Sequence, residues 1–236
     1  MRMELAFNLR ENFFYFDNRR FILSFFKKSL TEYRDGMFFD KFYSKDMKDN
    51  EMKKFSFAVN FNIDSIDKKN KVYIINDKKI FVTLDCESKR ICAILANAFI
   101  GQMFKDFKLK NNSMRLVGIR EVETFKIIGD EIDFKLKSHL IVRNGKENNN
   151  LYSLKDKEYD YELKKLISLK YDVDVSDIEV DTSGLHFTYV NFYNRNVKSA
   201  LGTVTIKADK ELLNRIYHGG IGSCVSSGFG FLDIEI

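Results

Sequence analysis

The 236-residue chain contains no proline and no tryptophan, and it has only three histidines and three cysteines. Beside abundant Lys, Asn, Ile and Phe, these gaps fit the codon bias of an AT-rich genome better than a structural demand. The cysteines, Cys86, Cys92 and Cys224, are odd in number and lack metal-ligand spacing. They therefore predict reduced thiols packed as small apolar side chains, and no metal site.

Long apolar runs are also missing, and none approaches the roughly 20 residues that span a bilayer. The first residues, Met-Arg-Met-Glu-Leu, lack the apolar core of a signal peptide. We therefore expect a cytoplasmic protein with no membrane association. The length suits one large domain or two small ones, and the net charge of +5 is compatible with a polyanionic partner.

The two halves of the chain show one order of patterns. Residues 3–9 alternate as a half-buried strand does, and Asp17 can cap a helix over 18–34 whose apolar residues recur at helical spacing. The other predicted elements are strands at 55–63, 71–75 and 79–84, a helix at 88–107, a strand pair near 114–128, a strand at 131–142, a helix at 156–170, strands at 185–193 and 201–207, a helix at 209–217 and a strand at 229–236. Each half approximates β-α-β-β-α-β. We predict an α+β fold of two tandem ferredoxin-like domains, residues 1–125 and 126–236.

A glycine-rich loop lies between the last predicted helix and the last strand, with glycine at 219, 220, 222, 228 and 230. Successive N–H groups of such a loop can form a concave site for anions such as phosphates. A helix before the glycines and a strand after them reverse the order of the nucleotide-binding fingerprint. The loop therefore predicts phosphate binding outside a nucleotide-binding fold.

Four stretches resemble the CRISPR-associated RAMP superfamily, and within it the repeat-processing endoribonuclease that cuts precursor CRISPR RNA. They are Phe55 to Phe61, Leu136 to Arg143, Tyr152 to Tyr171, and the loop Gly220-Ile-Gly-Ser-Cys-Val-Ser-Ser-Gly-Phe-Gly-Phe231.

The resemblance implies metal-independent cleavage within a repeat RNA, with no cofactor. The ribose 2′-OH attacks the adjacent phosphate and leaves a 2′,3′-cyclic phosphate and a free 5′-OH. Such a reaction needs a base, an acid and donors that stabilise the phosphorane charge. The implied partner is CRISPR repeat RNA, with other CRISPR effector subunits as further candidates, and the chain as monomer or homodimer.

Family members often carry a catalytic histidine after the first helix, but residues 35–54 contain none. The candidate catalytic residues there are Tyr33, Tyr43 and Lys45. A tyrosine is a poor base unless neighbouring cations lower its pKa.

The candidate RNA-binding residues fall into two groups. The first is a basic face of the first helix, with Arg19, Arg20, Lys27 and Lys28. The second surrounds the loop and comprises His218, Gly220, Gly222, Ser223, Ser226 and Gly228. His218 stands at a helix C-terminus, which favours a positive charge. Where family loops commonly place Lys or Arg, this loop has Cys224 to Ser226.

Two alternatives stay open. The missing histidine and the uncharged loop favour a non-cleaving RNA-binding RAMP subunit. The other is an RRM-like RNA-binding module unrelated to CRISPR systems, although neither half contains a convincing aromatic box of the kind that RRM sheets use for stacking.

Overall fold

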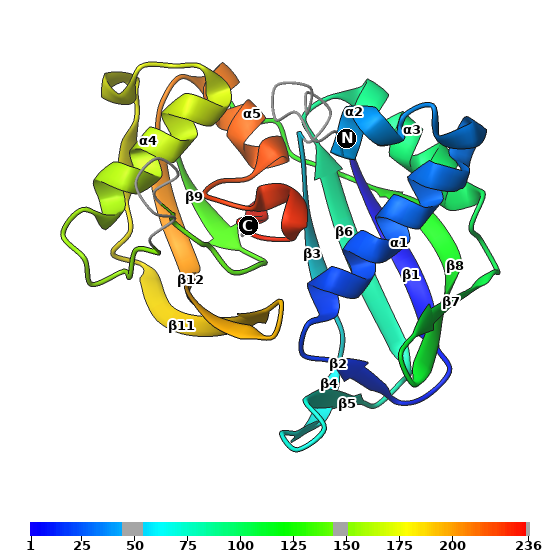
Figure 1. Cartoon of the computed structure of the whole chain (residues 1–236). Coiled ribbons are helices and arrows are strands. Elements are labelled where there is room, and N and C mark those ends of the chain that lie inside the picture. The colour runs from blue at the N-terminus through cyan, green and yellow to red at the C-terminus, as the bar shows by residue number, and fades with distance from the viewer. Residues whose placement is uncertain (44–53, 144–150, 235–236) are drawn as a thin grey trace. The chain divides into compact units, whose positions relative to one another are not determined.

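The computed structural model describes residues 1–43, 54–143 and 151–234. The chain forms two compact units, each of which combines a sheet with helices (Figure 1). The first unit comprises Met1–Lys54 and Val59–Glu123, and the second comprises Phe55–Ala58 and Thr124–Ile236. Within the described ranges, no helix combines the length and apolarity that crossing a bilayer demands.

A five-stranded sheet has the strand order β3-β6-β1-β8-β7, and it belongs to the first unit except for residues 55–58 of β3, which count with the second. Its strands are β1 (Arg2–Leu9), β3 (Phe55–Asn60), β6 (Lys79–Cys86), β7 (Asp106–Leu109) and β8 (Asn112–Val122). Helix α1 (Asn18–Glu32) follows β1, and α3 (Lys89–Ile100) follows β6. Apart from the added β7, this is β-α-β-β-α-β with the four strands ordered 2-3-1-4, which is the ferredoxin-like plan.

The second unit repeats the plan with the order β10-β12-β9-β13. Its strands are β9 (Glu131–Leu136), β10 (Glu179–Asp181), β12 (Arg195–Lys207) and β13 (Leu232–Ile234), and its helices are α4 (Tyr159–Tyr171) and α5 (Lys210–Gly219). Strand β11 (Leu185–Phe192) pairs with the first part of β12 as a hairpin. The predicted fold class, two ferredoxin-like domains, is confirmed.

Each unit buries its own core between helices and sheet. In the first, Phe7 of β1 meets Phe25 of α1 edge-on at 5.1 Å between ring centroids, and Phe25 stacks on Phe99 of α3 at 5.8 Å. Figure 1 shows α1 lying across the strands of this sheet. In the second, Phe134 of β9 and Ile167 of α4 are fully buried. Aromatic rings carry large buried areas, so these contacts hold the helices on their sheets.

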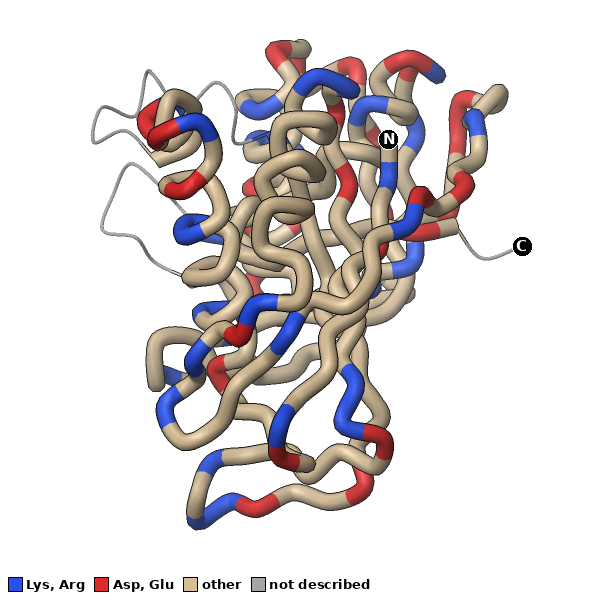
Figure 2. The backbone as a smooth tube through the Cα atoms, turned by 90° about the vertical axis from the view of Figure 1, so that its right-hand side faces the viewer, with Lys and Arg blue, Asp and Glu red and all other residues tan. Residues whose placement is uncertain are grey.

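The first unit adds elements to the ferredoxin-like plan. A small sheet has the order β2-β5-β4, from β2 (Phe13–Tyr15), β4 (Ile63–Asp67) and β5 (Val72–Ile75). A 3₁₀ turn, Tyr33–Gly36, and a short helix α2 (Phe39–Tyr43) follow α1. Lys and Arg positions are interspersed with Asp and Glu positions along the backbone, so no long segment carries one sign of charge (Figure 2).

Two predicted elements end earlier than the apolar pattern indicates. The helix predicted over 88–107 stops at Ile100, and Asp106–Leu109 forms β7, which pairs with β8 instead. The strand predicted over 131–142 stops at Leu136. Asp17 precedes α1, but its side chain makes no capping hydrogen bond.

Candidate nucleic-acid interface

The glycine-rich loop, residues 219–231, connects α5 to β13 in the second unit. Asp209 caps the N-terminus of helix α5, because its carboxylate accepts a hydrogen bond from the Glu211 N–H at 2.7 Å. The apolar face of α5 packs into the core, with Leu213 and Ile216 fully buried. The helix ends where Gly220 takes a positive φ of 74°. The loop is therefore positioned by a helix that the core holds in place.

Close packing explains the glycine at position 228. Its φ is +87°, a conformation that side chains disfavour, and a Cβ atom there would lie 2.7 Å from the ring of Phe57. Phe57 is itself fully buried. Part of the glycine pattern therefore serves packing within the unit.

Many backbone N–H groups of the loop donate hydrogen bonds within the protein. The Ser223 N–H donates to Ile141 O at 2.7 Å, and the Gly230 N–H donates to His139 O at 2.9 Å. The N–H groups of Gly220, Ile221, Ser227 and Gly228 likewise donate to the carbonyls of Ile216, Gly230, Cys224 and Val225. The expectation of free N–H groups at Gly220, Ser223 and Gly228 is therefore wrong. RNA binding by the loop residues Gly220, Gly222, Ser223, Ser226 and Gly228 stays a prediction.

Two side chains of α4 hold the end of α5. Tyr171 donates its hydroxyl to Gly220 O at 2.7 Å, and Lys170 Nζ donates to Gly220 O at 3.0 Å and also to Gly219 O. A cation at a helix C-terminus complements the partial negative charge of the last carbonyls. Lys170 and Tyr171 are thus positioning residues for the loop.

Arg143 lies beside the loop, and sequence reasoning did not single it out. Its backbone N–H donates to Ser223 Oγ at 3.2 Å. Burial raises the pKa of the Cys224 thiol, and the charge of Arg143 opposes that shift. Arg143 Nε is buried and has no hydrogen-bond partner within residues 1–43, 54–143 and 151–234. The loop therefore has a neighbouring cation, contributed from eighty residues earlier in the chain.

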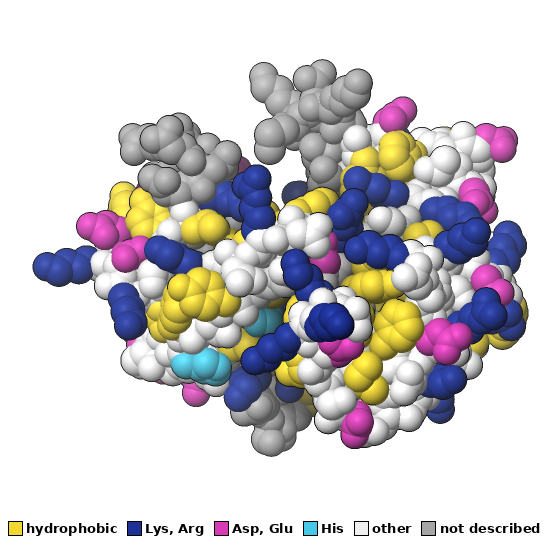
Figure 3. Space-filling model, turned by 60° about the horizontal axis from the view of Figure 1, so that its bottom comes forward, with side chains coloured by type: hydrophobic (Ala, Val, Ile, Leu, Met, Phe, Trp, Pro, Cys, Tyr) yellow, Lys and Arg dark blue, Asp and Glu magenta, His cyan; other side chains and the backbone are white. Residues whose placement is uncertain are grey.

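The three histidines differ in exposure. His218 is half-buried on α5 next to the loop, with its ring 5.1 Å from that of Tyr217. His139 is half-buried, and its carbonyl supports the loop. His186 of β11 is exposed, and histidine side chains reach the surface in Figure 3. His218 is thus the histidine adjacent to the glycines, as the sequence predicts.

The predicted basic face of α1 is only partly present. Arg20, Lys27 and Lys28 are exposed, but Arg19 is 8% exposed. Burial lowers the pKa of Arg19 to about 10, against the opposing effects of Tyr73 and Asp17. The expectation that Arg19 lies on the solvent face is wrong. The helix forms as its apolar spacing predicts, but Asn18 and Arg19 at its start are both buried.

Cations lie over both candidate tyrosines. Lys27 Nζ is 5.0 Å from the ring centroid of Tyr43, and the Arg34 guanidinium is 5.5 Å from that of Tyr33. Tyr33 also stacks on Phe38 at 5.8 Å. Lys45 lies outside the described residues. In the described part of the chain, no group of three His, Cys, Asp or Glu side chains is placed to hold a metal ion.

The sequence of the second unit matches a known family. Residues 119–234 match the family model described as "CRISPR associated protein Cas6, C-terminal". This region contains β9 to β13, α4, α5 and the glycine-rich loop. Among curated proteins, none matches the chain significantly.

Solved structures share the fold of the whole chain. A RAMP protein described as binding different RNA substrates has a TM-score of 0.80 at 16% identity, with 100% of each chain covered. A Cas6-related protein from Pyrococcus furiosus has a TM-score of 0.80 at 17% identity, over 100% of this chain and 98% of that one. A Cas6 product complex has a TM-score of 0.67 at 12% identity, over 98% of both chains. At such identities the likeness shows the fold alone. Residues 119–234 therefore carry a domain of the CRISPR-associated Cas6 family, its C-terminal one, and the whole chain has the fold of Cas6 and RAMP proteins.

Proposed function

We propose that the chain binds CRISPR repeat RNA and cleaves it without a metal ion. The observation that carries the proposal is the family match across the loop of residues 219–231, beside which Arg143 and His218 lie. Cationic side chains near a loop of this kind suit RNA phosphates. Two solved structures of the same fold, a RAMP protein that binds different RNA substrates and a Cas6 product complex, agree with this function.

In the proposed reaction, the ribose 2′-oxygen bonds to the adjacent phosphorus and the bond to the 5′-oxygen breaks. A base takes the 2′-OH proton, and an acid gives a proton to the leaving 5′-oxygen. Tyr33, Tyr43 and Lys45 remain the proposed candidates for these proton transfers. The Arg34 guanidinium and Lys27 Nζ lie over the rings of Tyr33 and Tyr43.

Cleavage is tested with end-labelled repeat RNA in EDTA, beside the same RNA carrying a 2′-deoxy substitution at the cut site. We expect cleavage of the first RNA and none of the second, because the 2′-oxygen is the nucleophile. The 5′ fragment should end in a 2′,3′-cyclic phosphate. Cleavage of the deoxy substrate, or cleavage that needs a divalent ion, would contradict the mechanism.

A second test concerns the cation beside the loop. Arg143→Ala is expected to weaken repeat-RNA binding roughly 10- to 100-fold, the range for one charge-assisted hydrogen bond. The magnitude of the slope of log affinity against log salt concentration should also fall by about 1, the value for one lost phosphate contact. The measurement is a salt series of fluorescence-anisotropy titrations. Lys207→Ala is the matched control, because Lys207 is an exposed cation at the far end of β12. Equal affinities for the two variants would remove Arg143 from the binding site.

The second candidate function is RNA binding without cleavage. It is favoured by the lack of a histidine in residues 35–54 and by the lack of Lys or Arg in the loop itself. Tight binding of intact repeat RNA, with no product in the EDTA experiment, would select it. Association with other CRISPR effector subunits, a monomeric or homodimeric state and a cytoplasmic location stay predictions under either function.

A further inference from the structure

The first unit has a sheet face that its own helices leave open. Along β1, Leu5, Phe7 and Leu9 are buried, and Phe7 meets α1 through Phe25. Asn8 alternates to the opposite face and is exposed. Its partner across β8 is Arg115, which is also exposed. Successive side chains of a strand point to opposite faces, so Asn8 and Arg115 belong to the face away from α1.

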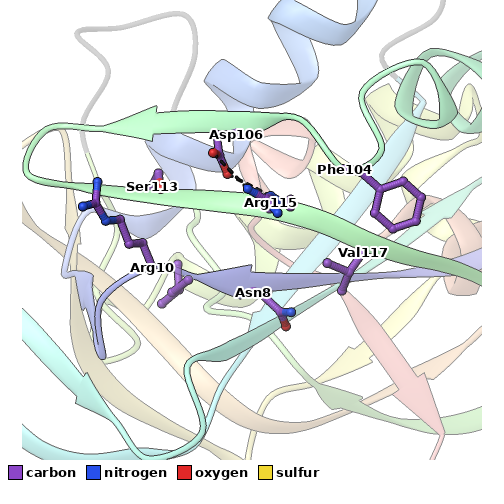
Figure 4. Close-up of a pocket in the computed structure, with 8 residues that line it drawn as sticks. Asn8, Arg10, Phe104, Asp106, Ser113, Arg115 and Val117 are labelled. Atoms are coloured by element: carbon purple, nitrogen blue, oxygen red, sulfur yellow. Dashed lines mark hydrogen bonds and ion pairs between the residues drawn. The ribbon is translucent and has the colours of Figure 1, made fainter.

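A hollow of about 510 Å³ lies on this open face, where β1, β7 and β8 end. It is lined by Asn8, Leu9, Arg10, Phe104, Asp106, Ser113, Arg115 and Val117. Figure 4 shows Arg10 and Phe104 toward opposite ends of the hollow, with Asp106 and Arg115 directed at one another between them. The hollow thus combines an aromatic ring, a cation and neutral polar groups.

The backbone fixes the two ends of the hollow. The Phe104 N–H donates to Leu116 O at 2.9 Å, and the Arg10 N–H donates to Ser113 O at 3.0 Å. Ser113 and Leu116 are three residues apart on β8, which is about 10 Å along a strand. That separation is on the scale of one nucleotide from base to phosphate. The ring of Phe104 is 65% exposed and the side chain of Arg10 is 79% exposed, so both are accessible.

An ion pair lies in the middle of the hollow. Arg115 donates to the two carboxylate oxygens of Asp106 at 2.9 and 3.1 Å. This bidentate pair lowers the pKa of the Asp106 carboxyl, chiefly through the hydrogen bonds from Arg115. Because Arg115 and Asp106 neutralise one another, the net charge of the lining comes from Arg10. The Arg10 guanidinium forms an ion pair with Glu11 at 3.7 Å, an exposed contact of little strength, and its charge also acts on Asp106.

We propose that this hollow is an RNA subsite that holds one unpaired nucleotide of the bound strand. The base stacks on Phe104, the amide of Asn8 and the hydroxyl of Ser113 meet the base edge, and Arg10 meets a phosphate. Only an unpaired nucleotide offers its base face to a side chain, and stacking tolerates any base. The subsite rests on the proposed RNA-binding function and deepens it by naming single-stranded RNA as a ligand of the first unit.

The test uses the full chain and a short fluorescent single-stranded RNA, with anisotropy as the readout. Phe104→Ala should weaken binding roughly 5- to 150-fold, the range for one lost base stack. Arg10→Ala should weaken it and lower the salt slope by about one contact. The matched controls are Ile100→Ala and Arg90→Ala, an exposed apolar residue and an exposed cation of α3, which should bind as the unaltered chain does.

A second readout locates the RNA directly. The same strand carrying 4-thiouridine should cross-link under ultraviolet light to a peptide that contains Phe104. Uridine monophosphate in excess should compete poorly, because a free nucleotide lacks the rest of the strand.

The outcomes separate the subsite from the function. Unchanged affinity of Phe104→Ala and Arg10→Ala, with cross-links confined to the second unit, would overturn the subsite and leave RNA binding intact. Saturable binding of uridine monophosphate that Phe104→Ala abolishes, without effect on RNA binding, would make the hollow a free-nucleotide pocket and overturn it too. If the unaltered chain binds no RNA even at low salt, the proposed function fails, and the subsite with it.

Discussion

Replacing Gly230 with alanine is expected to destabilise the second unit by about 3 kcal/mol or more. Gly230 is buried and has a φ of +59°, and a Cβ atom there would overlap the carbonyl oxygen of Ile221. The Ile221 N–H also donates to Gly230 O at 3.0 Å, so the two backbone segments cannot separate without losing that bond. A backbone neighbour cannot turn aside as a flexible side chain can. The loss should appear as a lower urea midpoint.

Gly129→Ala is the matched control for that experiment. Gly129 is exposed, and the nearest atom to a Cβ there would be Glu131 O at an ordinary 3.7 Å. Its effect on the free energy of unfolding should stay within about 0.5 kcal/mol, as for most surface substitutions. Hydrogen exchange of each variant should place the loss in the peptides of residues 219–231. An unchanged midpoint for Gly230→Ala would mean that the loop does not have this packed conformation in solution.

Asp85→Ala is expected to destabilise the first unit by about 3–5 kcal/mol, because it leaves a buried guanidinium without its carboxylate. Arg2 donates from Nε to Asp85 at 2.9 Å, with the two side chains 3% and 0% exposed. The Asp85 carboxylate also accepts the Cys86 N–H at 2.9 Å and lies 3.6 Å from the N-terminal ammonium group. The measurement is equilibrium unfolding in urea, followed by circular dichroism.

The control for Asp85→Ala is Asp106→Ala, which breaks an ion pair of similar geometry at the surface. Arg115 and Asp106 are 50% and 58% exposed, so water replaces the lost partner and the loss of stability should be much smaller than for Asp85→Ala. The two substitutions remove the same chemical group, and burial alone distinguishes them. Equal losses of stability would contradict the role assigned to burial.

Local patterns were sufficient for the fold class. The alternation at residues 3–9 and the helical spacing at 18–34 correspond to β1 and α1. Apolar residues repeat every 2 positions in a half-buried strand and every 3.6 positions in a helix, so neighbouring residues are enough to distinguish the two. Element ends were less predictable. The apolar spacing over 88–107 suits a helix. Asp106–Leu109 instead pairs along its whole length with β8, and that pairing depends on residues further along the chain.

The candidate site was predictable in part. The position of the loop after a helix and before a strand is visible in the sequence, and so is His218 beside it. The internal use of the loop amides was not visible, since their acceptors include Ile141 and His139, about eighty to ninety residues away. The place of Arg143 beside the loop was not visible either, since eighty residues separate it from Ser223.

The sequence by itself determined where most helices and strands lie, the duplicated ferredoxin-like order and the place of the glycines, because each depends on residues close together in the chain. Only the tertiary structure decided which charges are available to a ligand. It buries Arg19, which the helical spacing assigns to solvent, and it brings Arg143 to a loop that has no cation of its own. It also places Arg10 and Phe104 at two ends of one hollow on an open sheet face. Burial and proximity depend on contacts between segments that are distant in the sequence, and the local periodicity of a sequence does not encode those contacts.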